Sequence, residues 1–141
     1  MDPVSRSSHP QLMTVFRKAY AVVGALLFVE YLAQAFLIAT ALFTHTNTFG
    51  GFHPINGALM ISVTTLVMIA FSIGARHPGM TVLLTASLFL LLSLQFVLAI
   101  AGSPLVSGFD GLNALILIGA AGWLSSAHWA WRSRAVPRSL P

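Results

Sequence analysis

The chain has 141 residues, of which 57% are hydrophobic and only 7% charged, and its formal net charge at pH 7 is +4. Soluble domains carry roughly 25% charged residues, so this composition predicts an integral membrane protein and leaves no room for a soluble domain. Cysteine is absent, which excludes disulfides, iron–sulfur clusters and thiolate metal sites.

Four apolar segments follow one another along the chain, and each is long enough for the ~20 residues that cross ~30 Å of hydrocarbon. They cover residues 19–43, 52–75, 80–101 and 109–131. Because the connections are short, consecutive helices are expected to run antiparallel. The predicted fold is an all-α four-transmembrane-helix bundle in one domain, residues 1–141, with tails over residues 1–18 and 132–141. The first segment is too long for a signal-peptide core, so we expect it to be retained.

Basic residues lie only at alternate helix ends. Arg6, Arg17 and Lys18 precede the first predicted helix, Arg76 lies between the second and third, and Arg132, Arg134 and Arg138 follow the fourth. The other two connections contain no Lys or Arg, so the positive-inside rule predicts a multi-pass protein of the cell membrane with both termini in the cytoplasm. So few cations, clustered at helix ends, are typical of contact with anionic lipid and not of nucleic-acid binding.

The first predicted helix carries an acidic residue near the middle of the membrane. Glu30 lies about 18 Å along the helix from Lys18. A bare carboxylate there costs roughly 2.5 to 3.5 kcal/mol, so Glu30 is expected to be protonated, paired or in a wet cavity. Gln34 lies one turn further on, with Tyr31 nearby. Two readings stay open: a neutral acid hydrogen-bonded by Gln34 and a facing helix, or a proton-titrating relay or substrate contact.

One short phrase occurs twice, where the second and fourth predicted helices begin. It reads GFHPINGALMI over residues 51–61 and GFDGLNALILI over residues 108–118. In the first copy we expect His53 near the N-cap and Pro54 at the first helical position. In the second copy Asp110, a preferred N-cap residue, replaces the histidine. The phrase therefore predicts two helix starts.

The rest of each half supports an internal repeat. A buried glutamine precedes each copy, Gln34 in EYLAQAFLIA and Gln95 in LLLSLQFVLAIA. Both pairs of helices run out and back, so we expect two tandem hairpins related by a pseudo-twofold axis along the membrane normal. This axis would put His53 and Asp110 at one depth near the outer surface. The polar groups would then converge in the outer half of the bundle.

This pattern resembles an uncharacterised family of small bacterial four-helix integral membrane proteins that share a domain of unknown function. The resemblance rests on a buried Gln in the odd helices and on His-x-x-Asn-Gly or Asn-Ala opening the even ones, and it covers nearly the whole chain. The family has histidine in both even helices. This chain departs from that pattern at Asp110, which puts in doubt any role that needs a histidine pair.

Helical spacing predicts which faces of the even helices turn inward. The inward stripes are His53, Gly57, Met60 and Thr64 on the second helix, and Asp110, Ala114, Ala121 and His128 on the fourth. Two pairs of small residues, Ala121 with Ser125 and Gly122 with Ser126, would allow close helix approach. We expect these stripes to be packing surfaces.

The histidines make a tetrapyrrole site the main cofactor alternative. A bis-histidine haem needs two ligands at one depth on facing helices. On the outer side only His53 qualifies, with His45 in the loop as its one possible partner; Asn56, Gln34 and Gln95 would bond the cofactor. His77 and His128 form a weaker pair on the inner side. A single axial His53 would suit a chlorin equally well, and no other metal site is predicted.

Three functions follow from these patterns. The sequence contains no phosphate loop, no Ser-His-Asp set and no His-x-x-x-His pair, so the first is a non-enzymatic accessory or structural subunit that binds no cofactor. It would pack against lipid and a larger membrane complex, or against a second copy of itself. The second is a haem b or other tetrapyrrole electron-transfer protein that uses His53. The third is a proton-coupled carrier that uses Glu30.

Overall fold

The computed structural model describes residues 8–44, 47–100 and 103–133. Its helices are α1 (Ser8–Thr44), α2 (Asn47–Ile55), the π-helical turn η1 (Asn56–Ile61), α3 (Ser62–Gly74), α4 (Gly79–Ile100) and α5 (Pro104–Ser133). α2, η1 and α3 follow one another without a break and form one long helix. The described chain is therefore an all-α four-helix bundle, as the sequence predicts.

All four long helices are apolar enough to cross a membrane. The candidate spans are Gln11–Thr44, Gly51–Gly74, Gly79–Ile100 and Gly108–Ala127. Each has at least the ~20 residues that ~30 Å of hydrocarbon requires. The prediction of a multi-pass membrane protein is confirmed.

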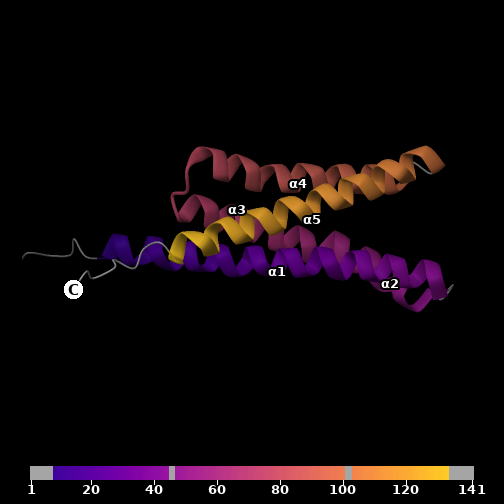
Figure 1. Cartoon of the computed structure of the whole chain (residues 1–141), viewed down its shortest axis with the longest axis horizontal. Coiled ribbons are helices and arrows are strands. Elements are labelled where there is room, and N and C mark those ends of the chain that lie inside the picture. The colour runs from indigo at the N-terminus through magenta and orange to yellow at the C-terminus, as the bar shows by residue number, and fades with distance from the viewer. Residues whose placement is uncertain (1–7, 45–46, 101–102, 134–141) are drawn as a thin grey trace, which may run out of the picture.

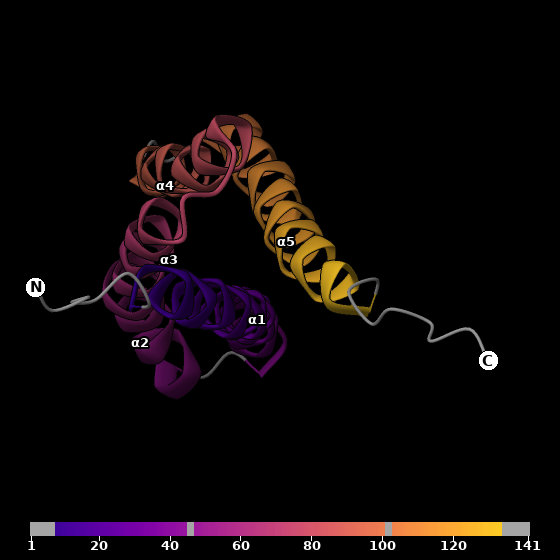
Figure 2. The same cartoon turned by 90° about the vertical axis from the view of Figure 1, so that its left-hand side faces the viewer.

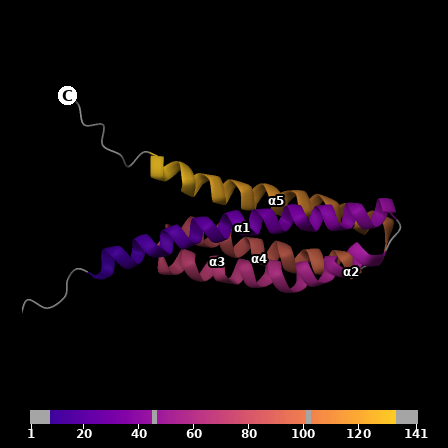
Figure 3. The same ribbon diagram turned by 90° about the horizontal axis from the view of Figure 1, so that it is seen from below.

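The bundle is a closed ring of antiparallel neighbours. α1 packs against α3 and α5, and α4 packs against the same two helices from the other side (Figures 1 and 2). Figure 1 shows α5 beginning beside α4 and ending beside α1, and Figure 3 shows it running alongside α1. We call the end with the α1–α2 and α4–α5 connections the distal end, and the end with the α3–α4 turn the terminal end. Hairpin 1 is α1 with α2, η1 and α3; hairpin 2 is α4 with α5.

The helices α1, α2 and α5 begin several residues earlier than the hydrophobic pattern indicates. α1 begins at Ser8 and not at residue 19, so most of the predicted N-terminal tail is helical. α5 begins at Pro104 and not at residue 109, since Ser103 Oγ accepts a hydrogen bond from the Val106 N–H at 3.3 Å. This is the N-cap geometry, followed by proline at the first helical position, where its missing N–H costs nothing. Hydropathy marks only the part of a helix inside the membrane.

The expected caps in the repeated phrase are accordingly wrong. α2 begins at Asn47, so His53 and Pro54 lie inside the helix and not at its start. Asp110 lies within α5, beyond its first turn, and is not an N-cap. A proline inside a helix removes one backbone hydrogen bond, and here the regular helix gives way to the π-turn directly after Pro54. Both copies of the phrase are interior helix segments.

The α3–α4 turn is a tight helix end at the terminal end. The Arg76 N–H bonds to the Ile73 carbonyl at 2.9 Å and the His77 N–H to the Ser72 carbonyl at 3.1 Å, which is the Schellman pattern. Arg76 takes the left-handed position with φ 50°, where glycine is the usual residue. Pro78 follows and prevents α3 from continuing.

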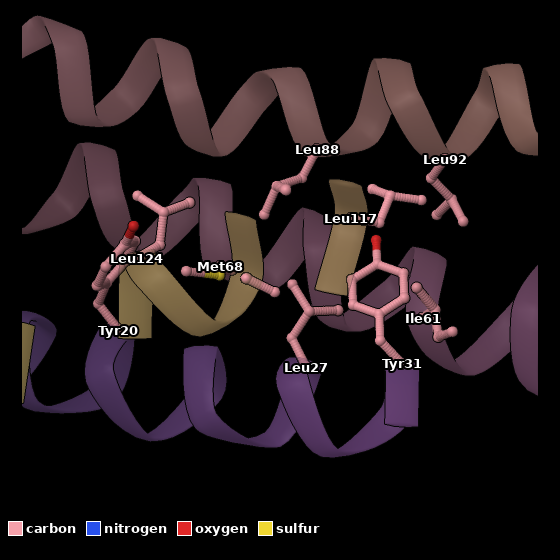
Figure 4. Packing of buried hydrophobic residues seen from close by; sticks show 10 residues of the cluster. Tyr20, Leu27, Tyr31, Ile61, Met68, Leu88, Leu92, Leu117 and Leu124 are labelled. Atoms are coloured by element: carbon pink, nitrogen blue, oxygen red, sulfur yellow. The ribbon is translucent and has the colours of Figure 1, made fainter. Parts of the chain in front are cut away.

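The core runs along the centre of the bundle, and all four long helices contribute to it (Figure 4). Leu27 and Tyr31 enter it from α1, and Leu88 and Leu92 enter it at the same spacing from α4. The remaining large members are Tyr20 from α1, Ile61 from η1, Met68 from α3, and Leu117 and Leu124 from α5. The two hairpins thus place buried residues at matching positions along their first helices.

The π-turn η1 changes which face of the second span is buried. Met60 was expected to point inward but is 50% exposed, whereas Ile61 is 1% exposed. A π-turn fits one more residue into a turn than an α-helix does, so residues after it are displaced around the helix. Gly57 and Thr64 of the predicted stripe are buried, and His53 is half-buried. The stripe was therefore correct except at Met60.

Small residues form the contact between α1 and α5. A Cβ on Gly24 would meet Ser125 Cα at 3.7 Å, and one on Gly122 would meet the Phe28 ring at 3.1 Å. Ala121 is fully buried, as the stripe on the fourth helix predicts, while Ala114 and Asp110 are half-buried. The Ala121 and Ser125 pair allows close approach as expected. Ser126 is exposed, so Gly122 and Ser126 do not form a second buried contact of this kind.

Candidate functional site

The first polar cluster, which we call the Gln34 cluster, joins α1 to α2 and η1 near the distal end. Gln34 Nε2 donates to the His53 carbonyl at 3.0 Å and lies 3.4 Å from His53 Nε2. Asn56 Nδ2 donates to Gln34 Oε1 at 2.8 Å and approaches the Glu30 carbonyl at 3.4 Å. Because an amide N–H only donates, His53 Nε2 acts as the acceptor, and a neutral ring carries its proton on Nδ1.

The second cluster, the Gln95 cluster, joins α4 to α5. Gln95 Nε2 donates to the Asp110 carbonyl at 3.1 Å and also to the Asp110 carboxylate. Asn113 Nδ2 donates to Gln95 Oε1 at 2.6 Å and to the Leu91 carbonyl at 2.9 Å. Asn113 is 5% exposed. All four amide contacts repeat those of the Gln34 cluster, with Asp110 in the place of His53 and Leu91 in the place of Glu30.

The two clusters lie toward the same end of the bundle, but no hydrogen bond among the described residues joins one cluster to the other. Each glutamine bonds within its own hairpin, so Gln34 and Gln95 do not bond each other. His53 and Asp110 lie near enough for their charges to interact, although they form no ion pair. The sequence therefore predicts most members of the clusters, but not the hydrogen bonds that Asn113 makes in the second one.

Glu30 makes a different contact from the one expected. Thr64 Oγ1 of α3 donates to Glu30 Oε1 at 2.9 Å, and Glu30 is 8% exposed. Gln34, the expected partner on α1, is turned toward His53 and Asn56 instead. Glu30 Oε2 is buried and has no hydrogen-bond partner among the described residues. The expected facing helix is thus correct, and the local partner is wrong because Gln34 is already engaged across the helix pair.

A second polar contact crosses the core nearer the terminal end. Thr85 Oγ1 donates to the Thr81 carbonyl at 2.7 Å, and the Tyr20 hydroxyl lies 2.8 Å from Thr85 Oγ1. Since the single proton of Thr85 is used, Tyr20 is the donor. The Tyr20 ring also lies against the His77 ring, with 4.8 Å between their centroids. The sequence gives no clear signal for this contact, because Tyr20 and Thr85 are far apart in the chain.

The histidines proposed for a tetrapyrrole are not brought together in the described part of the chain. His53 lies in the Gln34 cluster at the distal end, and His77 lies beside Tyr20 in the α3–α4 turn. His45 falls outside the described residues. His9 and His128 lie in α1 and α5, where their side chains are not described. Within the described residues no three His, Cys, Asp or Glu side chains are grouped for a metal ion.

Comparison of the chain with protein-family models finds no match, and neither the curated proteins nor the solved structures give a significant one. The function is therefore inferred from the geometry of the two clusters and of Glu30.

Proposed function

We propose that this chain is a non-enzymatic four-helix membrane protein, an accessory or structural subunit that packs against a larger membrane complex. One observation carries the proposal: the amides suggested as a cofactor site bond one another and the backbone. The lone pair of His53 Nε2 that would bind a metal is directed at Gln34. In lipid, such side chain contacts hold helices together. The clusters therefore act as two matching clasps, one in each hairpin.

The proposal includes an origin by duplication of one hairpin. Three observations support it: the two clusters repeat the same bonds, Leu27 and Leu88 are both fully buried, and Tyr31 and Leu92 hold matching core positions. It also includes membership of the uncharacterised small bacterial four-helix family, with Asp110 as the departure. By the positive-inside rule, the proposal assigns the terminal end to the cytoplasmic side of the inner membrane and the distal end to the outside.

One face of α5 suits contact with a partner helix. Gly111, Leu115 and Gly119 are one turn apart and exposed, and a Cβ on either glycine would meet no atom within 4 Å. Small residues on an outward face let another helix approach closely. We assign this face to the partner protein, or to a second copy of the chain.

Purification from native membranes in mild detergent tests the proposal. We expect the chain to elute with a partner subunit or as a homo-oligomer. The substitution Gly119→Leu should reduce the amount of complex, while Ala70→Leu, on an exposed face of α3, should not. A monodisperse monomer without a partner would contradict the proposal. A complex unaffected by Gly119→Leu would instead show that the partner binds another face.

The same sample tests the tetrapyrrole alternative, in which His53 Nε2 would bind iron in place of its contact with Gln34. Visible absorption spectra of the oxidised and dithionite-reduced protein should be featureless. A Soret band with sharp reduced bands, or a far-red chlorin band, would favour the alternative. Loss of that pigment in His53→Ala but not in His9→Ala would then identify His53 as the ligand.

A further inference from the structure

The two hairpins differ at a few positions that carry protons. The Asn56 and Asn113 bonds align Glu30 with Leu91, since each offers its carbonyl to the equivalent asparagine. The same alignment pairs Tyr31 with Leu92 and His53 with Asp110. Hairpin 1 therefore has a carboxyl, a phenol and an imidazole where hairpin 2 has two leucines and a carboxylate.

Each of these three groups in hairpin 1 has a buried polar atom that lacks a hydrogen-bond partner among the described residues. The atoms are Glu30 Oε2, His53 Nδ1 and Tyr31 Oη, of which Tyr31 Oη lies against Thr65 without a regular hydrogen bond. The described side chains of α4 and α5 contain no such atom. Figure 4 shows the Tyr31 ring extending from α1 into the core, with its hydroxyl directed toward Leu117. Buried polar groups are usually bonded, so an unpaired atom indicates a role other than packing.

The fold does not require an acid at this place. Hairpin 2 fills the position of Glu30 with Leu91, which packs against the same core. An acidic side chain in the hydrocarbon is costly and is a functional residue by default. The π-turn η1 lies beside Glu30 through the Asn56 contact, and hairpin 2 has no π-turn in its described residues. Turns of this kind are frequent at functional sites.

The geometry points to a reversible proton-binding site at Glu30 inside the membrane, with His53 as the group that exchanges protons with the distal end. The Glu30 carboxylate takes up one proton on Oε2 and becomes a neutral acid, while Thr64 continues to donate to Oε1. His53 accepts or releases that proton at the end of the span. This role is independent of the subunit role, because a chain that purifies alone would still bind the proton.

Few titratable groups face Glu30. Tyr31 lies next to it on α1, His53 is the titratable residue of α2, and Asp110 is the acidic residue of α5. η1, α3 and α4 contain no acidic, basic, histidine or tyrosine side chain. No cation on η1, α3 or α4 can compensate a Glu30 carboxylate. Their lack of positive charge favours the protonated form of Glu30.

Infrared difference spectroscopy of the protein in lipid nanodiscs tests the site. At neutral pH we expect the C=O stretching band of a protonated carboxylic acid in the wild type and in Asp110→Asn, and its loss in Glu30→Leu. Glu30→Leu copies hairpin 2 and should fold; Glu30→Gln serves as a second variant. In Thr64→Val the band should shift, because one hydrogen bond to the acid is lost. On raising the pH the wild-type band should disappear reversibly.

Two results would overturn the inference. One is a spectrum without a carboxylic-acid band that depends on Glu30 at neutral pH. The other is a band that no accessible pH removes, which would make Glu30 a permanently neutral packing residue. The role of His53 is tested by the rate at which the band shifts after transfer to D₂O. We expect His53→Gln to slow the shift several-fold and Ser93→Ala, on an exposed face of α4, to leave it unchanged; equal rates would remove His53 from the site.

Discussion

Gly57 lies so close to Gln34 that a Cβ on residue 57 would be 2.8 Å from Gln34 Nε2. The contact belongs to the π-turn, where hairpin 1 has one residue more than hairpin 2. Asn56 is followed by Gly57 and Ala58, whereas Asn113 is followed directly by Ala114. Beyond the turn Ile61 matches Leu117 in the core. Any side chain here would enter the space of the Gln34 amide and displace it from its hydrogen bonds to His53 and Asn56.

Replacing this glycine should therefore destabilise the bundle. We expect Gly57→Ala to lower the free energy of unfolding by about 1–3 kcal/mol, the usual cost of overpacking. Gly51→Ala is the matched control, because a Cβ there meets no atom within 4 Å. It should be neutral or stabilising by up to about 1 kcal/mol, since alanine is the better helix former. Denaturation in mild detergent measures both; equal effects would mean that Gln34 moves aside without cost.

Deleting Gly57 should be tolerated, although deletions inside helices usually are not. Without it Asn56 would be followed by Ala58, as Asn113 is by Ala114, and the turn could become a regular α-helix. Deleting the exposed Leu66 from α3 is the control, since each residue turns a regular helix by about 100° and Met68 would leave the core. Circular dichroism and size-exclusion chromatography should show a folded protein for the first deletion and an unfolded or aggregated one for the second. The opposite order would disprove the match between the hairpins.

Much of this architecture could be predicted from the sequence, because the bilayer imposes simple rules. Hydropathy alone gives the four spans and the bundle, since each span must satisfy its backbone internally. Gln34, Asn56 and Gln95 were identified because a polar residue in an apolar helix needs a partner. The partners themselves were partly wrong: Glu30 bonds Thr64 and not Gln34.

The details that failed depend on local backbone geometry. Helical periodicity assumes 3.6 residues per turn, so it places Met60 inward and cannot anticipate a π-turn. The signal was present in the sequence, as the extra glycine between Asn56 and Ala58. The Ser103 cap before Pro104 is also visible in the sequence, but the hydropathy pattern predicted that the helix begins later, near Asp110. The left-handed Arg76 carries no signal, because glycine is the residue expected there.

The two asparagines should contribute equally if the clusters are equivalent clasps. Asn56→Ala and Asn113→Ala should each lower the free energy of unfolding by about 0.6–2 kcal/mol, the range measured for polar contacts between membrane helices. Ser93→Ala is the control, because exposed Ser93 bonds only within its own helix and should be neutral. Double-mutant cycles of Asn56 with Gln34 and of Asn113 with Gln95 isolate the pair energies. A coupling energy present in one cycle and absent from the other would contradict the equivalence.

The two buried tyrosines of α1 should respond unequally to loss of their hydroxyl. The Tyr20 hydroxyl bonds Thr85 across the core, so Tyr20→Phe should cost about 0.5–1.5 kcal/mol of the free energy of unfolding. Tyr31 is almost as deeply buried, but its hydroxyl lies against Thr65 without forming a regular hydrogen bond. Tyr31→Phe removes only this weaker contact, so it should cost clearly less than Tyr20→Phe or be neutral. Denaturation of both variants in the same detergent makes the comparison direct, because ring packing is unchanged in each. A clear loss of stability in Tyr31→Phe would mean that its hydroxyl is hydrogen-bonded in the membrane, and Tyr31 would then leave the set of unpaired groups around Glu30.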